Sequence, residues 1–163
     1  ASRREGMVRP YQLLFVCDGN ICRSPMAMAI ARHYAWEFGI EAEVRSCGLL
    51  GIENSPADSH AIAVCSEIGI ELREHRSQGI TNELLEWADY IFAMQLHQVM
   101  KIRQEHIDVG ERLHLLGTYA GVPEIPDPIG GWRFQFRRCR KDIQRALETF
   151  MSRLSPQGMQ EEP

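Results

Sequence analysis

Apolar side chains along the chain alternate between two spacings, which predict strands and helices in turn. Residues 11–17, YQLLFVC, are a short apolar run typical of a buried strand. Residues 25–38 repeat apolar side chains every three or four positions, which predicts a helix. We expect Ser24 to be the N-cap of this helix and Gly39 to end it. The positions that face inward are Ala27, Ile30, Ala31, Tyr34 and Phe38.

The rest of the chain continues this alternation. Further strands are predicted at 41–46, 90–94 and 112–116, and further helices at 58–68, 81–88, 95–104 and 132–154. Four short strands, each followed by a helix directly or after a loop, predict an α/β fold. We expect a four-stranded parallel sheet with helices on both faces, in three layers. Residues 1–163 are expected to form one domain, with an ordered core at about 10–154 and a disordered tail at 155–163.

Composition places the chain among ordinary globular proteins. Of its 163 residues, 44% are hydrophobic and 25% are charged, and 18 basic against 22 acidic side chains give a net charge of -4. This balance predicts neither a nucleic-acid partner nor an acidic membrane partner. The sequence has no apolar run of about 18 residues and begins without the apolar segment of a secretory signal, so we expect a cytoplasmic protein. Its five cysteines, an odd number, are expected to be reduced thiols.

The segment 17–24, CDGNICRS, joins the first predicted strand to the first predicted helix, and we call it the phosphate loop. A loop that enters a helix N-terminus presents unpaired backbone N–H groups to an oxyanion. Gly19 and Asn20 readily adopt the positive φ that turns successive amides toward one point. Arg23 adds a planar guanidinium that can hold two phosphoryl oxygens. The sequence therefore predicts a binding site for a tetrahedral phosphate after the first strand.

Cys17 opens the phosphate loop and is the candidate nucleophile. Helix dipoles and a nearby guanidinium favour the thiolate form of a cysteine. Ionisation alone can raise the rate only about 30-fold, so positioning and stabilisation of charge must supply most of the acceleration. Cys139 and Arg145 have the same spacing as Cys17 and Arg23, but they lie within a predicted amphipathic helix without a glycine. We interpret Cys139 as a core thiol and Arg145 as a surface residue.

Asp127 follows the fourth predicted strand, in the segment IPDPIGG, and should emerge at the same end of the sheet as Cys17. Phosphoryl transfer needs an acid for the leaving oxygen and a base for water, and one carboxyl group can serve as both. The alternative is that Asp127 and its neighbouring prolines simply form a rigid turn. The local sequence leaves both interpretations open.

Three segments together resemble the low-molecular-weight protein tyrosine phosphatase family: VCDGNICRSP near the N-terminus, HRS at 75–77 and DP at 127–128. The similarity extends from about Leu13 to Leu154. It implies that Cys17 attacks phosphorus to form a cysteinyl-phosphate and that Asp127 serves as acid and then base. It also implies a phosphorylated protein or peptide as substrate and no metal or cofactor. The phosphate would be bound by Arg23 and the backbone amides of Asp18, Gly19, Asn20, Ile21, Cys22 and Arg23.

The resemblance also assigns supporting roles. Ser24 would donate a hydrogen bond to the sulfur of Cys17, and Asn20 would be held in its left-handed conformation by Ser24, Ser46 and His75. For His75 the alternative is an exposed polar residue. Cys22 is either a partner that traps oxidised Cys17 as a disulfide or a residue that only fills space. We do not expect a zinc site at the two cysteines, since no second pair of ligands lies near them in the sequence.

The sequence departs from the tyrosine phosphatase pattern where aromatic side chains usually flank the pocket, because Ile52 and Ile129 occupy those places. The segment DPIGG is similar to the DPFGG of bacterial protein-arginine phosphatases in the same family, whereas Ile21 matches the tyrosine branch, in place of threonine. We favour phosphotyrosine, with phosphoarginine as the alternative. Asp18 is unusual beside a phosphate site, and we expect it to point into solvent.

Two other functions and one aromatic side chain complete the predictions. An arsenate reductase would need further cysteines close together, and Cys47, Cys65 and Cys139 are scattered. A non-catalytic phosphate-binding module would normally lack Cys17 or Asp127. Trp132 could supply an aromatic ring near the pocket, but we favour packing at the start of the last helix.

Overall fold

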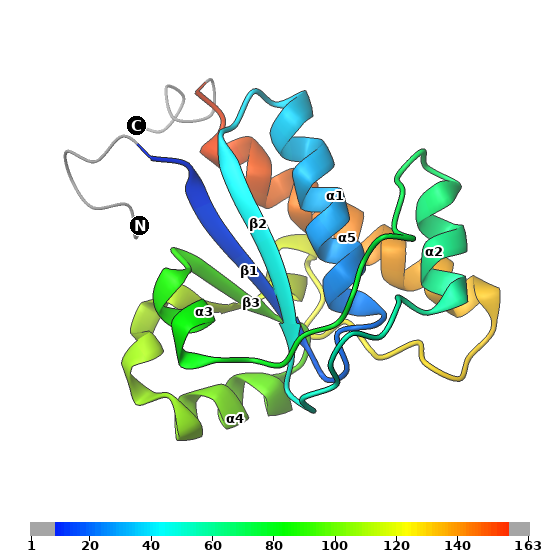
Figure 1. The fold of residues 1–163 in the computed structure, drawn as a ribbon. Coiled ribbons are helices and arrows are strands. Elements are labelled where there is room, and N and C mark those ends of the chain that lie inside the picture. Colours follow the sequence, from blue (N-terminus) through cyan, green and yellow to red (C-terminus); the bar gives the residue numbers. More distant parts are fainter. Residues whose placement is uncertain (1–8, 157–163) are drawn as a thin grey trace.

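The computed structural model of the protein describes residues 9–156. Its parallel sheet has the strand order β2-β1-β3-β4, with β1 at Tyr11–Cys17, β2 at Ala42–Gly48, β3 at Tyr90–Ala93 and β4 at Leu113–Leu115. The helices are α1 (Arg23–Glu37), α2 (Ser59–Ser66), α3 (Asn82–Trp87), α4 (Leu96–Glu105) and α5 (Arg133–Leu154). Helices α1 and α5 cover one face of the sheet and α3 and α4 the other, with α2 beside α5 (Figure 1). The predicted three-layer α/β fold is confirmed.

The apolar run of β1 is explained by burial on both faces of the sheet. Leu13 and Phe15 pack into the apolar cluster under α1 and α5, where Phe15 stacks on Phe92 at 5.3 Å between ring centroids. Leu14 and Val16 point to the opposite face and join the cluster under α3 and α4. Because successive side chains of a strand alternate between faces, a central strand covered on both sides must be apolar at every position.

The sheet topology has a switch point beside β1. From β1 the chain passes to α1 on one face, whereas from neighbouring β3 it passes to α4 on the other face. The two connections therefore diverge at the carboxyl ends of these strands, which is where open α/β sheets bind ligands. Cys17 is the last residue of β1, and Gln95 lies just beyond the end of β3. Both lie at this switch point.

Several predicted boundaries differ from the structure. Helix α1 begins at Arg23, with Cys22 in the N-cap position, so the prediction that Ser24 caps the helix is wrong. The hydroxyl of Ser24 is instead occupied within the phosphate loop. Strand β4 is only three residues long because the chain turns at once into the 3-10 segment η2 (Leu116–Ala120). Another 3-10 segment, η1 (Ile107–Arg112), follows α4.

Both ends of the last helix bear on earlier predictions. Trp132, in the N-cap position of α5, is 76% exposed, so the prediction that it packs against the start of this helix is wrong. Most of the predicted disordered tail, 157–163, lies outside the described residues. Within residues 9–156, none of the helices combines the length and the apolar character needed to cross a membrane.

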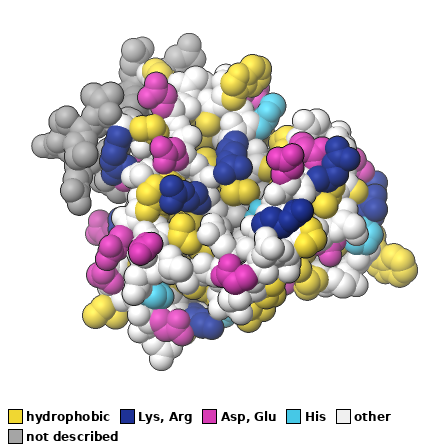
Figure 2. Space-filling view, viewed as in Figure 1, with side chains coloured by type: hydrophobic (Ala, Val, Ile, Leu, Met, Phe, Trp, Pro, Cys, Tyr) yellow, Lys and Arg dark blue, Asp and Glu magenta, His cyan; other side chains and the backbone are white. Residues whose placement is uncertain are grey.

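Basic and acidic side chains are interspersed on the face of the molecule that Figure 2 shows. Elsewhere in the described residues, Arg45 lies over the ring of Trp87 at 4.2 Å and Arg137 pairs with Glu67 at 2.7 Å. On this face the charge is therefore mixed, as the near balance of acidic and basic residues in the sequence suggests.

Candidate active site

The phosphate loop is built around a left-handed residue. Asn20 is fully buried and has a φ of 57°. This conformation turns its backbone N–H toward the start of the loop, where it donates a hydrogen bond to Cys17 Sγ at 3.2 Å. Gly48 at the end of β2 allows the loop to approach the sheet closely, because a Cβ there would lie 2.9 Å from the backbone of Asp18, Gly19 and Asn20. The loop thus packs closely against the carboxyl end of β2.

The side chain of Asn20 connects the loop to two other segments. Its Nδ2 donates to Ser24 Oγ at 2.8 Å and to Ser46 Oγ at 2.9 Å, and its Oδ1 accepts from the backbone N–H of Gln78 at 3.0 Å. His75 Nε2 donates to the carbonyl oxygen of Asn20 at 2.8 Å. The expected contacts with Ser24, Ser46 and His75 are therefore present, and the contact with Gln78 is an addition.

His75 is half-buried against the loop, rather than exposed on the surface. Burial lowers the pKa of His75 below its ordinary value, and the positive charges of Arg32 and Arg76 act in the same direction, while the hydrogen bond to Asn20 opposes them. The lowered pKa favours the neutral imidazole near pH 7, with its proton on Nε2 toward the carbonyl oxygen. The interpretation of His75 as a merely exposed polar residue is wrong.

Cys17 is buried at the end of β1 and has two polar neighbours. Its sulfur is 3.0 Å from Ser24 Oγ and accepts the N–H of Asn20. Hydrogen bonds to sulfur stabilise the thiolate more than the thiol. Burial raises the pKa values of Cys22, Cys47, Cys65 and Cys139, so that these four thiols stay protonated. Cys139 is a buried thiol and Arg145 is exposed, as predicted for this second occurrence of the spacing.

Arg23 is 1% exposed, yet part of its guanidinium is unpaired. Its Nη1 donates to Gln95 Oε1 at 2.6 Å and to the carbonyl oxygen of Ile125 at 2.9 Å. Its Nε is buried and has no hydrogen-bond partner. A buried donor without a partner normally carries a substantial free-energy penalty, so this N–H marks a place for an acceptor from outside the protein.

Two carboxylates lie near the remaining nitrogen of this guanidinium. Arg23 Nη2 is 3.4 Å from Asp18 Oδ2 and 3.5 Å from Asp127 Oδ2. Asp127 reaches this point from the loop before α5, where its Oδ1 also accepts the N–H of Ile129 at 3.1 Å. The structure thus brings Asp127 to the same site as Arg23, across more than a hundred residues of sequence.

The prediction that Asp18 points into solvent is wrong. Its side chain is 29% exposed, and its Oδ1 accepts from His97 Nε2 and from Gln98 Nε2, both at 3.0 Å. Burial alone would raise the pKa of Asp18, but the hydrogen bonds from Gln98 and His97 and the charge of Arg23 outweigh it and lower the pKa. Asp18 is therefore ionised near neutral pH, beside the phosphate loop.

Sequence reasoning missed three glutamines that hold the site together. Gln78 supports Asn20, Gln95 holds Arg23, and Gln98 holds Asp18 while its Oε1 accepts the backbone N–H groups of Met94 and Gln95. Only Gln95 carried a usable signal, because it follows the end of a predicted strand next to β1.

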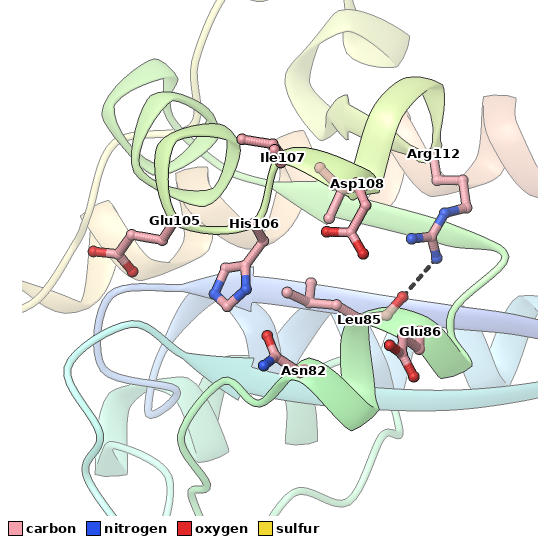
Figure 3. Close-up of a pocket in the computed structure, with 9 residues that line it drawn as sticks. Asn82, Leu85, Glu86, Glu105, His106, Ile107, Asp108 and Arg112 are labelled. Atoms are coloured by element: carbon pink, nitrogen blue, oxygen red, sulfur yellow. Dashed lines mark hydrogen bonds between the residues drawn. The ribbon is translucent and has the colours of Figure 1, made fainter.

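A second cleft, of about 250 Å³, lies between α3 and η1 (Figure 3). Acidic side chains border it, among them Glu86, Glu105 and Asp108. The guanidinium of Arg112 donates to the carbonyl oxygens of Leu85 at 2.6 Å and Ala88 at 2.7 Å, so it serves the end of α3. None of the residues of the phosphate loop lines this cleft.

Comparisons with known proteins agree with this geometry. The family described as low molecular weight phosphotyrosine protein phosphatase matches residues 12–160. A protein-arginine-phosphatase of Geobacillus stearothermophilus is 35% identical over 148 residues, which cover 90% of this chain and 95% of the relative. A probable low molecular weight protein-tyrosine-phosphatase, EpsP, of Ralstonia nicotianae is 33% identical over 146 residues, which cover 90% of this chain and 97% of the relative.

A solved structure of the arginine phosphatase YwlE, a variant with a phosphorylated active-site serine in place of cysteine, has a TM-score of 0.83. It is 31% identical to this chain, and the match covers 88% of this chain and 95% of that structure. Fold, phosphate loop and relatives together define the protein as a hydrolase, a protein phosphatase. More particularly, the chain belongs to the low molecular weight phosphotyrosine protein phosphatase family.

Proposed function

We propose that Cys17 is the nucleophile of a phosphatase reaction that proceeds through a cysteinyl-phosphate. The thiolate attacks phosphorus, and the bond from phosphorus to the leaving oxygen breaks while Asp127 gives its proton to that oxygen. Asp127, now ionised, accepts a proton from water, which attacks the cysteinyl-phosphate and releases inorganic phosphate and the Cys17 thiolate. Contact with Ser24 Oγ at 3.0 Å supports the sulfur as it leaves.

One observation carries this proposal: the guanidinium of Arg23, in the phosphate loop that Cys17 opens, is buried with its Nε unpaired. Its Nη1 is occupied by protein oxygens, whereas Nε and Nη2 form the edge of the guanidinium that can bind two phosphoryl oxygens together. The amides of residues 18–23 would complete the phosphate site as the loop enters α1. Charge-assisted hydrogen bonds of this kind supply the stabilisation of equatorial oxygens that phosphoryl transfer requires.

For the substrate we propose phosphotyrosine in a protein or peptide. A methyl group at Gly19 would lie 3.5 Å from the side chain of Ile21 and 3.7 Å from that of Ile52, so these two side chains flank the loop with apolar surface. Apolar surface beside the phosphate site favours an aromatic ring over a charged leaving group. The family description and the relative in Ralstonia support the same substrate.

Phosphoarginine is the second candidate. Gly130 and Gly131 follow the Asp-Pro pair as they do in the arginine branch, and the relative in Geobacillus is a protein-arginine-phosphatase. The carboxylates of Asp18 and Asp127 near Arg23 also offer favourable electrostatics to a cationic leaving group. All the relatives reported above are phosphatases, so we do not retain arsenate reductase or a non-catalytic module.

Hydrolysis of an aryl phosphate tests the chemistry. Cys17→Ser is expected to abolish turnover, and Asp127→Asn to lower kcat by on the order of a hundredfold, because the leaving oxygen loses its acid. Cys139→Ser is a matched control, since Cys139 has the same spacing to an arginine, and this variant is expected to keep its turnover. Full activity of Cys17→Ser, or loss of activity in Cys139→Ser at unchanged stability, would refute the assignment.

Peptide substrates test the branch. The wild type is expected to hydrolyse phosphotyrosine peptides with a higher kcat/KM than phosphoarginine peptides, and Ile21→Thr is expected to reduce that ratio because a hydroxyl replaces apolar surface. A preference for phosphoarginine with Ile21 intact contradicts the proposed substrate but not the proposed chemistry.

We further infer one phosphatase domain in the cytoplasm. The two apolar clusters pack on opposite faces of a single sheet and share its strands, which supports one folding unit across residues 9–156. All five cysteines are free thiols, which supports a reducing compartment.

A further inference from the structure

Asp18 places a fixed negative charge on the rim of the phosphate site. Gln98 and His97, both in α4, hold its Oδ1 at 3.0 Å, and its Oδ2 faces Arg23 Nη2 at 3.4 Å. The side chain links the phosphate loop, which follows β1, to α4, which follows the neighbouring strand β3. Asp18 is therefore held beside the guanidinium rather than free to turn away from it.

Arg23 does not depend on Asp18 for its position. Its Nη1 makes two short hydrogen bonds, to Gln95 and to the carbonyl oxygen of Ile125, whereas the contact with Asp18 is a long one. The guanidinium is also enclosed, with 1% exposure. Charge-assisted hydrogen bonds at 2.6 and 2.9 Å restrain a side chain far more strongly than one at 3.4 Å. Removal of the carboxylate would thus change the electrostatic potential at the site more than its geometry.

Building on the phosphatase function proposed above, we propose that Asp18 sets the phosphate affinity of the site by acting as a resident counterion of Arg23. Its carboxylate competes with phosphoryl oxygens for the Nη2 edge and repels a dianion that binds there. The consequence is weaker binding of inorganic phosphate, the product, and of the phosphorylated substrate alike. The free enzyme keeps a neutralised, preformed site, and product phosphate leaves readily.

The sign of this effect follows from the ionisation of Asp18. Its hydrogen bonds and its proximity to Arg23 keep the side chain negative at neutral pH. Other charged or titratable groups near it are His97 on α4, Asp127, which contacts the same guanidinium, and Cys17, its neighbour in the chain. A carboxylate this close to a bound dianion, in a partly buried setting, changes the affinity on the order of tenfold. Because the repulsion between Asp18 and the dianion acts on substrate and product similarly, it alters KM and inhibition by phosphate together and leaves kcat nearly unchanged.

Titration with inorganic phosphate, followed by calorimetry, tests the proposal on three variants. Asp18→Asn keeps the shape and an oxygen acceptor for Gln98 and His97, but removes the charge. Asp18→Leu removes the charge and the hydrogen bonds. Asp108→Asn is the matched control, because it changes the net charge equally. Asp108 lines the cleft between α3 and η1 (Figure 3), which no residue of the phosphate loop lines, and it follows the C-terminal end of the ten-residue helix α4.

Asp18→Asn is expected to lower the dissociation constant of phosphate about tenfold, with KM for an aryl phosphate lowered in parallel and kcat within about twofold of wild type. Asp18→Leu is expected to tighten binding as well, and Asp108→Asn to change it by less than about twofold. Unchanged or weaker binding in both Asp18 variants overturns the proposal, and so does equal tightening in Asp108→Asn. The calorimetric result stands even if the wild type hydrolyses no phosphate ester, so failure of the proposed reaction is distinguished from failure of this inference.

Discussion

Replacement of Asn20 by alanine tests the side-chain hydrogen bonds that hold the phosphate loop in place. The change removes two hydrogen bonds donated by Nδ2, to Ser24 and Ser46, and one accepted by Oδ1 from Gln78. At about 1 kcal/mol each, their loss costs about 3 kcal/mol. A further ~1 kcal/mol arises because alanine is strained at the φ of 57°. The total of about 4 kcal/mol is a large part of the 5–15 kcal/mol that typically stabilises a domain of about this size.

Asn54 provides a matched control, because it also has a positive φ, of 60°, but it is exposed. Asn54→Ala should therefore lose only the ~1 kcal/mol of backbone strain. Urea unfolding followed by tryptophan fluorescence measures the free energy of unfolding of both variants, and Asn20→Gly separates the strain from the hydrogen bonds. We expect the free energy of unfolding of Asn20→Gly to be about 1 kcal/mol higher than that of Asn20→Ala. Equal losses in Asn20→Ala and Asn54→Ala, with phosphate affinity unchanged in both, would refute this account of the loop.

Two further predictions concern the surroundings of the loop. Gly48→Ala is expected to lower the free energy of unfolding by about 1–3 kcal/mol and to remove most of the phosphate affinity, because its Cβ would lie 2.9 Å from backbone atoms of the loop. Urea unfolding measures the first effect and phosphate calorimetry the second. Wild-type phosphate affinity in this variant would contradict the close approach. The free energy of unfolding is also expected to fall as the pH decreases from about 6.5 toward the lowered pKa values of His75 and His114, because the unfolded chain then binds protons that the folded chain does not. The slope is at most about 1.4 kcal/mol per pH unit for each histidine, and solvent screening makes it smaller. Urea midpoints at about pH 7 and pH 5 measure this slope, which should be shallower in His75→Gln; an unchanged slope would rule His75 out as its source.

Local pattern was sufficient for most of the fold. The strand at 11–17 is apolar because it is buried on both faces, and a run of this kind is visible in sequence without any partner. The limits of the prediction appear where tertiary contacts decide. Ser24 looks like an N-cap in isolation, but its hydroxyl has better-placed partners in Cys17 and Asn20, and the helix begins at Arg23, two residues earlier than predicted.

The candidate site shows the same division. A strand, a Gly-Asn pair, an arginine and a helix start are contiguous, so the phosphate loop could be predicted from one short segment. Asp18 could not be placed in this way, because its partners His97 and Gln98 lie about eighty residues further along the chain. Sequence showed that a carboxylate next to a phosphate site is unusual, but the hydrogen bonds that hold it there arise only from the packing of α4.

The phosphate loop depends for its shape on four distant stretches of chain, through Ser46, the segment 75–78, Gln95 and Ile125. Two of these are irregular loops, which open more readily than the sheet and helices around them. If either loop lost its contacts with the phosphate loop, the enzyme would lose activity while circular dichroism still reported a native helix content. Loss of turnover would thus be the earliest sign of damage from mild heat, denaturant or proteolysis in this protein.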